Sequence, residues 1–249
     1  MSGLAVMLIA VGVADVCRRL TERLWVPVVI APVVVVGGAA LAGLWHVGDI
    51  ALLVIAAVAS VGWLLLCARA ERTGEHEVAP LVLFGSAVGL LIVLSGWGSD
   101  VTGLVHRWSS WSGLPGIEDV DPNRLLMVVG VVLLQLVTGN QVVRLILGSV
   151  GAIKPVGEPQ PSDRLKGGRL LGPMERLLIV GLGLGGQLAA ATAVVAAKSI
   201  IRFPEINAES KRKNDPAESD IGIDEVTEYF LVGSFASWIL ALAGLVLAQ

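Results

Sequence analysis

Long apolar stretches, separated by short charged or polar intervals, make up most of this chain. Most of them have about the 20 residues that an α-helix needs to cross the hydrocarbon core of a bilayer. The pattern therefore predicts an all-α fold, a polytopic transmembrane helical bundle of about seven spans. The predicted spans are Gly3–Val16, Trp25–Leu44, Ile50–Ala68, Pro80–Trp97, Leu125–Leu147, Met174–Ser199 and Asp224–Ala248.

The predicted spans fall into two parts along the chain. Residues 1–124 hold the first four spans and a Trp-rich loop, Gly98–Asn123, whose indole rings suit the membrane interface. Residues 125–249 hold the other three spans. We therefore predict an N-terminal and a C-terminal transmembrane part that meet between residues 124 and 125.

The stretch Pro173–Arg202 organises the C-terminal part. It carries charges only near its two ends, with Gln187 and several glycines between them. As one straight helix it would hold Glu175 and Lys198 about 35 Å apart, too far to share a site. As a re-entrant hairpin turning at Gly181–Gly186, it would bring both ends to one side of the membrane. The single crossing is our main interpretation, and the hairpin stays open.

The Lys and Arg residues between the spans predict an orientation. With the N-terminus outside, the basic intervals after the first, third and fifth spans lie inside, as the positive-inside rule requires. The interval after the sixth span disagrees, because Lys211, Arg212 and Lys213 would then lie outside. Three explanations stay open. The earlier loops set the orientation, the sixth span is re-entrant, or an earlier span, above all the first, is miscounted.

Composition narrows the range of functions. The chain is 55% hydrophobic and 16% charged, which is more apolar than a soluble domain. The net charge of −3 and the lack of a basic, aromatic-interleaved stretch argue against nucleic acid as a partner. The sequence contains no Walker loop, HExxH, CxxC or GxSxG motif, so we expect neither a cofactor nor a metal site.

The polar residues that border the last two spans are the first candidate site. Lys198 and Arg202 share one helical face at the end of the sixth span, beside Ser199. Glu228 and Tyr229 open the seventh span, and Glu205 follows the sixth. The set predicts either a structural ion pair with snorkelling bases or an anion site for a phosphate or carboxylate group. A proton relay through Glu228 is a third alternative.

A second group of polar residues lies around the fifth and sixth spans. Asn140 and Arg144 are four residues apart near the end of the fifth span. Arg169, Glu175 and Arg176 stand at the start of the sixth. We predict that these side chains converge, either as an interfacial anchor or as part of an anion or lipid site in which Glu175 and Asn140 orient the bases.

The C-terminal half resembles a family of bacterial integral-membrane proteins of unassigned function. The matching blocks are TGNQVVRLIL (Thr138–Leu147), GGRLLGPMERLLI (Gly167–Ile179), AAKSIIRFPEI (Ala196–Ile206) and EYFLVGSFASW (Glu228–Trp238). The resemblance implies a multi-pass helical bundle in the bacterial inner (plasma) membrane and no particular reaction. Some relatives have an N-terminal half rich in His and Asp, reminiscent of metal-dependent hydrolases. This chain departs there, with only His46, His76 and His106.

The sequence leaves three functional hypotheses. The favoured one is a non-enzymatic membrane protein that binds or moves an anionic lipid headgroup or a small anion, as an oligomer or a pore. The second is an enzyme acting on a lipid-linked phosphate, with Glu175, Glu205 or Glu228 as acid or base. The third is a scaffold that docks a partner protein through loop 148–172 or loop 202–223. Membrane lipids are partners in all three, and homo-oligomerisation is left open.

Overall fold

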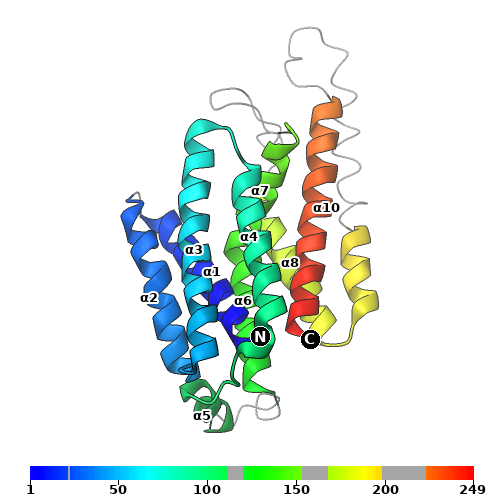
Figure 1. The fold of residues 1–249 in the computed structure, drawn as a ribbon. Helices are drawn as coiled ribbons and strands as arrows, with labels where there is room; N and C mark the ends of the chain where they lie inside the picture. The colour runs from blue at the N-terminus through cyan, green and yellow to red at the C-terminus, as the bar shows by residue number, and fades with distance from the viewer. Residues whose placement is uncertain (22, 112–119, 153–167, 198–222) are drawn as a thin grey trace. The chain divides into compact units, whose positions relative to one another are not determined.

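The computed structural model describes residues 1–249 except 22, 112–119, 153–167 and 198–222. The described residues form two compact units. The first is Met1–Thr138 with Leu247–Gln249, and the second is Gly139–Val246. All regular secondary structure in the described ranges is helical, which confirms the predicted all-α class (Figure 1).

Each unit is a set of helices. The first unit contains α1 (Ser2–Leu20), α2 (Trp25–Ala42), α3 (Val47–Thr73), α4 (Val78–Val93), η1 (Leu94–Trp97), α5 (Leu104–Trp111), α6 (Pro122–Leu133) and η2 (Leu134–Thr138). The second contains α7 (Gly139–Ser149), α8 (Gly168–Leu184), the returning helix Leu188–Ala197, and α10 (Ile223–Ala248) up to its last turn.

Five described helices are long and apolar enough to cross a membrane, which makes this a membrane-embedded protein. They are Trp25–Ala42, Val47–Thr73, Val78–Trp97, Pro122–Ser149 and Thr227–Ala248. They correspond to the second, third, fourth, fifth and seventh predicted spans. The count of about seven is not confirmed, because the first and sixth predicted spans fold differently from a lipid-facing crossing helix.

The first predicted span is the interior helix of the first unit. Most of α1 is buried, and it packs against α2, α3 and α6 (Figure 1). Glycines allow the close approach to α6: a Cβ atom on Gly12 would lie 2.8 Å from Cβ of Leu133, and one on Gly130 would lie 3.0 Å from the carbonyl oxygen of Ala5. Small residues at such contacts let helix backbones pack closely.

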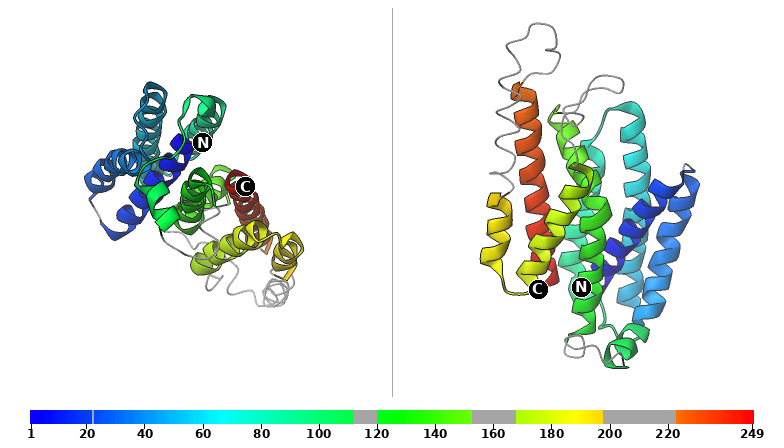
Figure 2. Two further views of the ribbon diagram at one scale, coloured as in Figure 1. Left: turned by 90° about the horizontal axis from the view of Figure 1, so that it is seen from below. Right: turned by 180° about the vertical axis from the view of Figure 1, so that it is seen from behind.

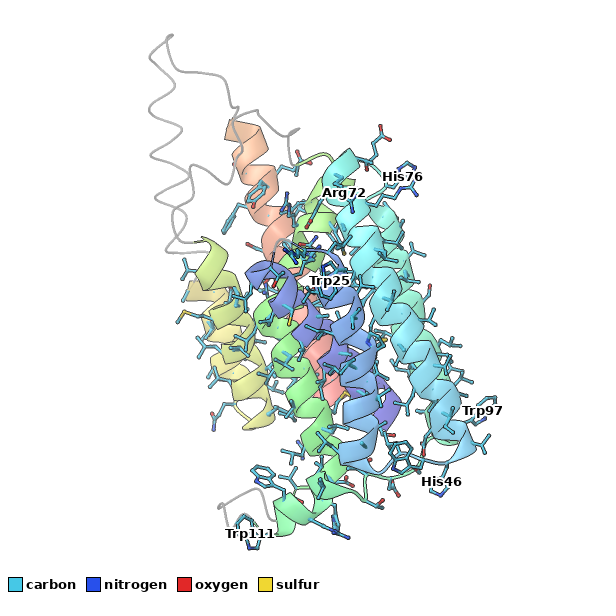
Figure 3. All side chains as sticks on the ribbon, turned by 90° about the vertical axis from the view of Figure 1, so that its left-hand side faces the viewer. Trp25, His46, Arg72, His76, Trp97 and Trp111 are labelled. Atoms are coloured by element: carbon cyan, nitrogen blue, oxygen red, sulfur yellow. The ribbon has the colours of Figure 1, made fainter. Side chains whose placement is uncertain are left out.

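The described residues of the first unit show which charged and aromatic side chains lie at each of its two ends. Arg18 Nη1 lies 3.4 Å from Glu71 Oε1, so the ends of α1 and α3 meet, as the predicted orientation requires. Trp25, Arg72 and His76 lie toward this end, and His46, Trp97 and Trp111 lie at the opposite end (Figure 3). The basic intervals after the first and third predicted spans therefore share one end.

At the end where His46 and Trp97 lie, a buried carboxylate joins two segments by hydrogen bonds. Asp49, 1% exposed, accepts hydrogen bonds from Ser99 N at 2.7 Å, from Ser99 Oγ at 2.6 Å and from His46 N at 3.1 Å. The last contact belongs to a capping box at the start of α3. These bonds join the N-terminus of α3 to the segment after η1.

The sixth predicted span is not one straight helix, and the favoured interpretation of Met174–Ser199 is wrong. α8 ends at Leu184, and Gly186 has φ +73°, a left-handed conformation that glycine adopts without strain. The chain then reverses into the returning helix, which packs back on α8 through Ile179 and Ala191 (Figure 2). The sequence had left this hairpin open, with its turn at Gly181–Gly186.

Contacts within the second unit fix the directions of its helices. Arg176 bonds Ser237, and seven residues further along α8 Gly183 touches Leu245. The later residue of α8 thus contacts the later residue of α10, so the two helices run parallel. The returning helix runs antiparallel to both. It follows that α8 begins, the returning helix ends and α10 begins at one and the same end of this unit.

The direction of α7 is the reverse of that of α10. Near the end of α7, Leu147 would lie 3.5 Å from a Cβ atom on Gly233 of α10. Two turns earlier in α7, Asn140 binds Arg176, which also binds Ser237, and Ser237 lies later in α10 than Gly233. α7 therefore ends at the end where α10 begins. The described residues that flank intervals 153–167 and 198–222 lie at that end, so a hairpin that does not cross the membrane would remove the disagreement with the positive-inside rule.

This arrangement predicts the result of a labelling experiment. In a chain whose Cys17 and Cys67 are replaced by Ser, a cysteine at position 149 and one at position 210 should react with a membrane-impermeant maleimide from the same side. Ser149 is exposed at the end of α7, and Ser210 lies outside the described residues. Labelling of the two positions from opposite sides would show that Met174–Ser199 crosses the membrane.

Candidate functional site

A buried arginine lies at the centre of the second unit. Arg176, on α8, is 1% exposed. Its Nη1 donates to Ser237 Oγ of α10 at 3.1 Å, and its Nη2 donates to Asn140 Oδ1 of α7 at 2.7 Å. Both of these partners are neutral groups, and the two hydrogen bonds orient the guanidinium.

Gly139 makes room for this side chain, and Gly172 lies within ordinary contact distance of it. A Cβ atom on Gly139 would lie 2.9 Å from Nε and 3.0 Å from Cζ of Arg176, closer than packed atoms tolerate. One on Gly172 would lie 3.4 Å from Nη1 and 3.5 Å from Asn140 Oδ1. The guanidinium therefore packs directly on the backbone at the start of α7, and the site exists because residue 139 has no side chain.

A buried carboxylate neighbours the arginine in the sequence. Glu175 is 7% exposed, and its Oε1 accepts a hydrogen bond from Trp238 Nε1 at 2.7 Å. Trp238 also packs against the apolar cluster of Ile179, Ala191 and Ala241. α8 and α10 are thus joined by two neighbouring polar contacts, Arg176 to Ser237 and Glu175 to Trp238, next to a hydrophobic core.

The structure brings together part of the predicted site. Asn140, Glu175 and Arg176 converge as expected, and we name them with Ser237 and Trp238 the Arg176 cluster. Arg144 lies on α7 and is exposed, outside this cluster. Arg169 lies in the first turn of α8, and its side chain is not among those described. All of these residues belong to the second unit.

The remaining candidates divide into two sets. Glu228 and Tyr229 lie in α10, where Glu228 is exposed and Tyr229 half-buried. Lys198, Ser199, Arg202 and Glu205 lie outside the described residues, so the predicted pairing of Glu228 with the bases stays a prediction. The returning helix nevertheless runs back along α8 toward the end at which α8 begins (Figure 2).

Sequence reasoning missed two members of the Arg176 cluster. Ser237 and Trp238 have no role of their own in the sequence-based predictions, and they enter them only within the matching block Glu228–Trp238. A buried serine hydroxyl and an indole N–H both need partners, and a nearby Glu–Arg pair in another span offers them. The need of Ser237 and Trp238 for hydrogen-bond partners can be read from the sequence, but the span that supplies those partners cannot.

Arginine in this setting suits one kind of ligand chemistry. Its planar guanidinium matches the two oxygens of a phosphate or carboxylate, which Lys does not. Within the described residues no group of three or more His, Cys, Asp or Glu side chains could hold a metal ion. Comparison with protein-family models, with curated proteins and with solved structures finds no match.

Proposed function

We propose that this protein is a non-enzymatic, multi-pass membrane protein that binds an anionic group at the Arg176 cluster, either a lipid phosphate or a small free anion. On the resemblance of its C-terminal blocks, we place it in the bacterial inner (plasma) membrane. The observation that carries the proposal is the burial of Arg176 to 1% exposure within a bundle of apolar helices. An ionisable residue kept at such a position is expensive and commonly functional.

The surroundings of Arg176 support binding rather than packing alone. Asn140 and Ser237 hold the guanidinium in one orientation, which lowers the entropy lost on binding a ligand. The hairpin formed by α8 and the returning helix supplies a broken helix beside the cluster. Broken helices of this kind are tolerated in membranes where they line a cavity or a substrate site.

The test measures anion binding directly. The purified protein in detergent is offered phosphatidylglycerol and phosphatidylcholine at equal concentration, and retained lipid is counted by native mass spectrometry. A second arm titrates inorganic phosphate by calorimetry. We expect at least one anion to bind, and Arg176→Lys to weaken it about tenfold because Lys cannot make the bidentate contact.

The two arms separate the sources of the anion. Retention of phosphatidylglycerol without phosphate binding assigns the site to a lipid headgroup, and the reverse assigns it to a free anion. Arg69→Lys, an exposed arginine on α3, is the control and should bind as the wild type does. If neither anion binds, or if Arg176→Lys binds them unchanged, the proposal is wrong.

A glycine variant provides a second test that leaves every charge in place. Gly139→Ala puts a methyl group against the guanidinium of Arg176 and should weaken anion binding by displacing it. Gly181→Ala is matched to it, since a Cβ atom there meets nothing within 4 Å. Equal binding by the two alanine variants would show that the position of the guanidinium is irrelevant.

A further inference from the structure

A second buried charge lies in the first unit, in its interior helix. Asp15, on α1, is 2% exposed. Its Oδ2 accepts a hydrogen bond from Trp63 Nε1 of α3 at 3.2 Å. Its other oxygen, Oδ1, is buried and makes no hydrogen bond. A buried carboxylate oxygen without a hydrogen bond is expensive, so its surroundings call for an explanation.

Two more buried polar atoms near Asp15 also lack hydrogen bonds. Arg18 Nη1 is one, although it faces Glu71 at 3.4 Å, and Arg18 Nε lies 3.8 Å from Asp15 Oδ1. The other is Oγ1 of Thr138, a fully buried residue that interacts with the Asp15 carboxyl. An acceptor, a donor and a hydroxyl that can do either are the partners that a buried water molecule needs.

The backbone beside this group is irregular. Thr138 closes η2, a π-helical turn, and Arg19 Nη2 donates to the carbonyl oxygen of Val137 in that turn at 2.7 Å. Single π-helical turns occur mostly as insertions in α-helices and are frequent at functional sites. Here the turn directs Thr138 toward α1, and Arg19 fixes the turn from the same end.

We propose that Asp15, Arg18 and Thr138 enclose a site for one water molecule, through which Asp15 takes up and releases a proton. The proton comes from solvent at the end where Arg18 meets Glu71. The bound water gives its proton to Asp15 Oδ1, forming the O–H bond, and regains one from solvent. The carboxylate becomes a neutral acid, and the site gains one positive charge.

Both protonation states have partners in this geometry. The ionised carboxylate faces the guanidinium of Arg18, and the neutral acid can donate its O–H to Thr138 Oγ1 or to the water. Exposure of the side chains rises outward, from 3% for Asp15 to 16% for Arg18 and 35% for Glu71. These three residues therefore mark a polar route from the interior to the basic end of the unit.

The groups that face Asp15 come from few elements. α1 itself supplies Arg18 and Arg19, α3 supplies Trp63 and, through Arg18, Glu71, and η2 supplies Thr138. α2, α4 and η1 also pack against α1 and carry no ionisable side chain, and the only one of α6 is Arg124 in its first turn. Cys17 of α1 and Cys67 of α3 are ionisable as well, so the titration is assigned to Asp15 by its loss in the Asp15→Asn variant.

Trp63 reports on Asp15 because its indole N–H is bonded to the carboxylate. The full chain is labelled with 5-fluorotryptophan, and Trp63→Phe assigns the ¹⁹F resonance of residue 63. In the wild type we expect this resonance to shift in one transition between pH 4 and pH 10. Asp15→Asn should abolish the transition, because the amide has no proton to gain in this range.

Two arginine variants keep the proposal testable if Asp15→Asn does not fold. Arg18→Gln removes the nearest positive charge, so the pH midpoint should rise by about one unit or more. Arg23→Gln, an exposed arginine at the same end, should leave it unchanged within about 0.2 units. A resonance that does not titrate, a transition that survives Asp15→Asn, or a midpoint unmoved by Arg18→Gln would each overturn the proposal.

Discussion

Replacing Arg176 with Met is expected to lower the free energy of unfolding by about 3 kcal/mol, because it removes one partner from a buried polar cluster. Met fills a similar length but donates no hydrogen bond, so Asn140 Oδ1 and Ser237 Oγ both lose a donor. The loss is costly because Arg176 and Ser237 are both buried. The measurement is an SDS titration of the purified protein in mixed micelles, followed by tryptophan fluorescence.

The control for this variant lies on a neighbouring helix. Arg144 is exposed on α7, so Arg144→Met should change the free energy of unfolding by no more than about 0.5 kcal/mol. The pair separates burial of the guanidinium from the general effect of losing a positive charge. Losses of equal size for the two variants would contradict the central position that we assign to Arg176.

The helices were the predictable part of the fold. In a bilayer every backbone N–H and C=O must be bonded within the segment, so long apolar stretches have little choice but helix. The five helices that are long and apolar enough to cross a membrane follow from this rule alone. The hairpin does not follow from it, because an apolar run with a glycine pair in its middle satisfies the rule either as one helix or as two.

The Gly185–Gly186 turn shows what composition leaves undecided. Glycines inside a membrane helix serve equally well as contact points for a neighbouring helix and as a place for the chain to reverse. The outcome here depends on how α8 packs against α10, where Gly183 touches Leu245. That contact joins residues far apart in the chain and has no local signature.

The candidate site was predictable in its charges and not in its neutral partners. Glu175, Arg176 and Asn140 stand out because polar groups beside apolar runs are rare. Asp15 was not predicted, because a charged residue at the end of a short apolar run usually lies at the membrane interface. Ser237, Trp238 and Trp63 are ordinary in helices, and only tertiary packing gives them buried hydrogen bonds.

The position of α1 was hidden for a related reason. Lipid and the interior of a membrane bundle are equally apolar, so a helix surrounded by protein has the same composition as one facing lipid. Only its small residues differ in use: Gly12 is pressed against Leu133, whereas a Cβ atom on Gly37 of α2 would meet nothing within 4 Å. The interior position of α1 can therefore be tested by comparing the stability of variants at Gly12 and Gly37.

Replacing Gly12 with Val should therefore destabilise the protein by about 3 kcal/mol, the upper range for overpacking a close contact. The new Cβ atom would lie 2.8 Å from Cβ of Leu133, so α1 and α6 must separate. Gly37→Val introduces the same side chain into a helix with the same change in propensity, and it should be nearly neutral. The SDS titration used for Arg176 measures both. A helix α1 that faced lipid would give the two variants equal stability, because neither valine would then meet a neighbouring helix.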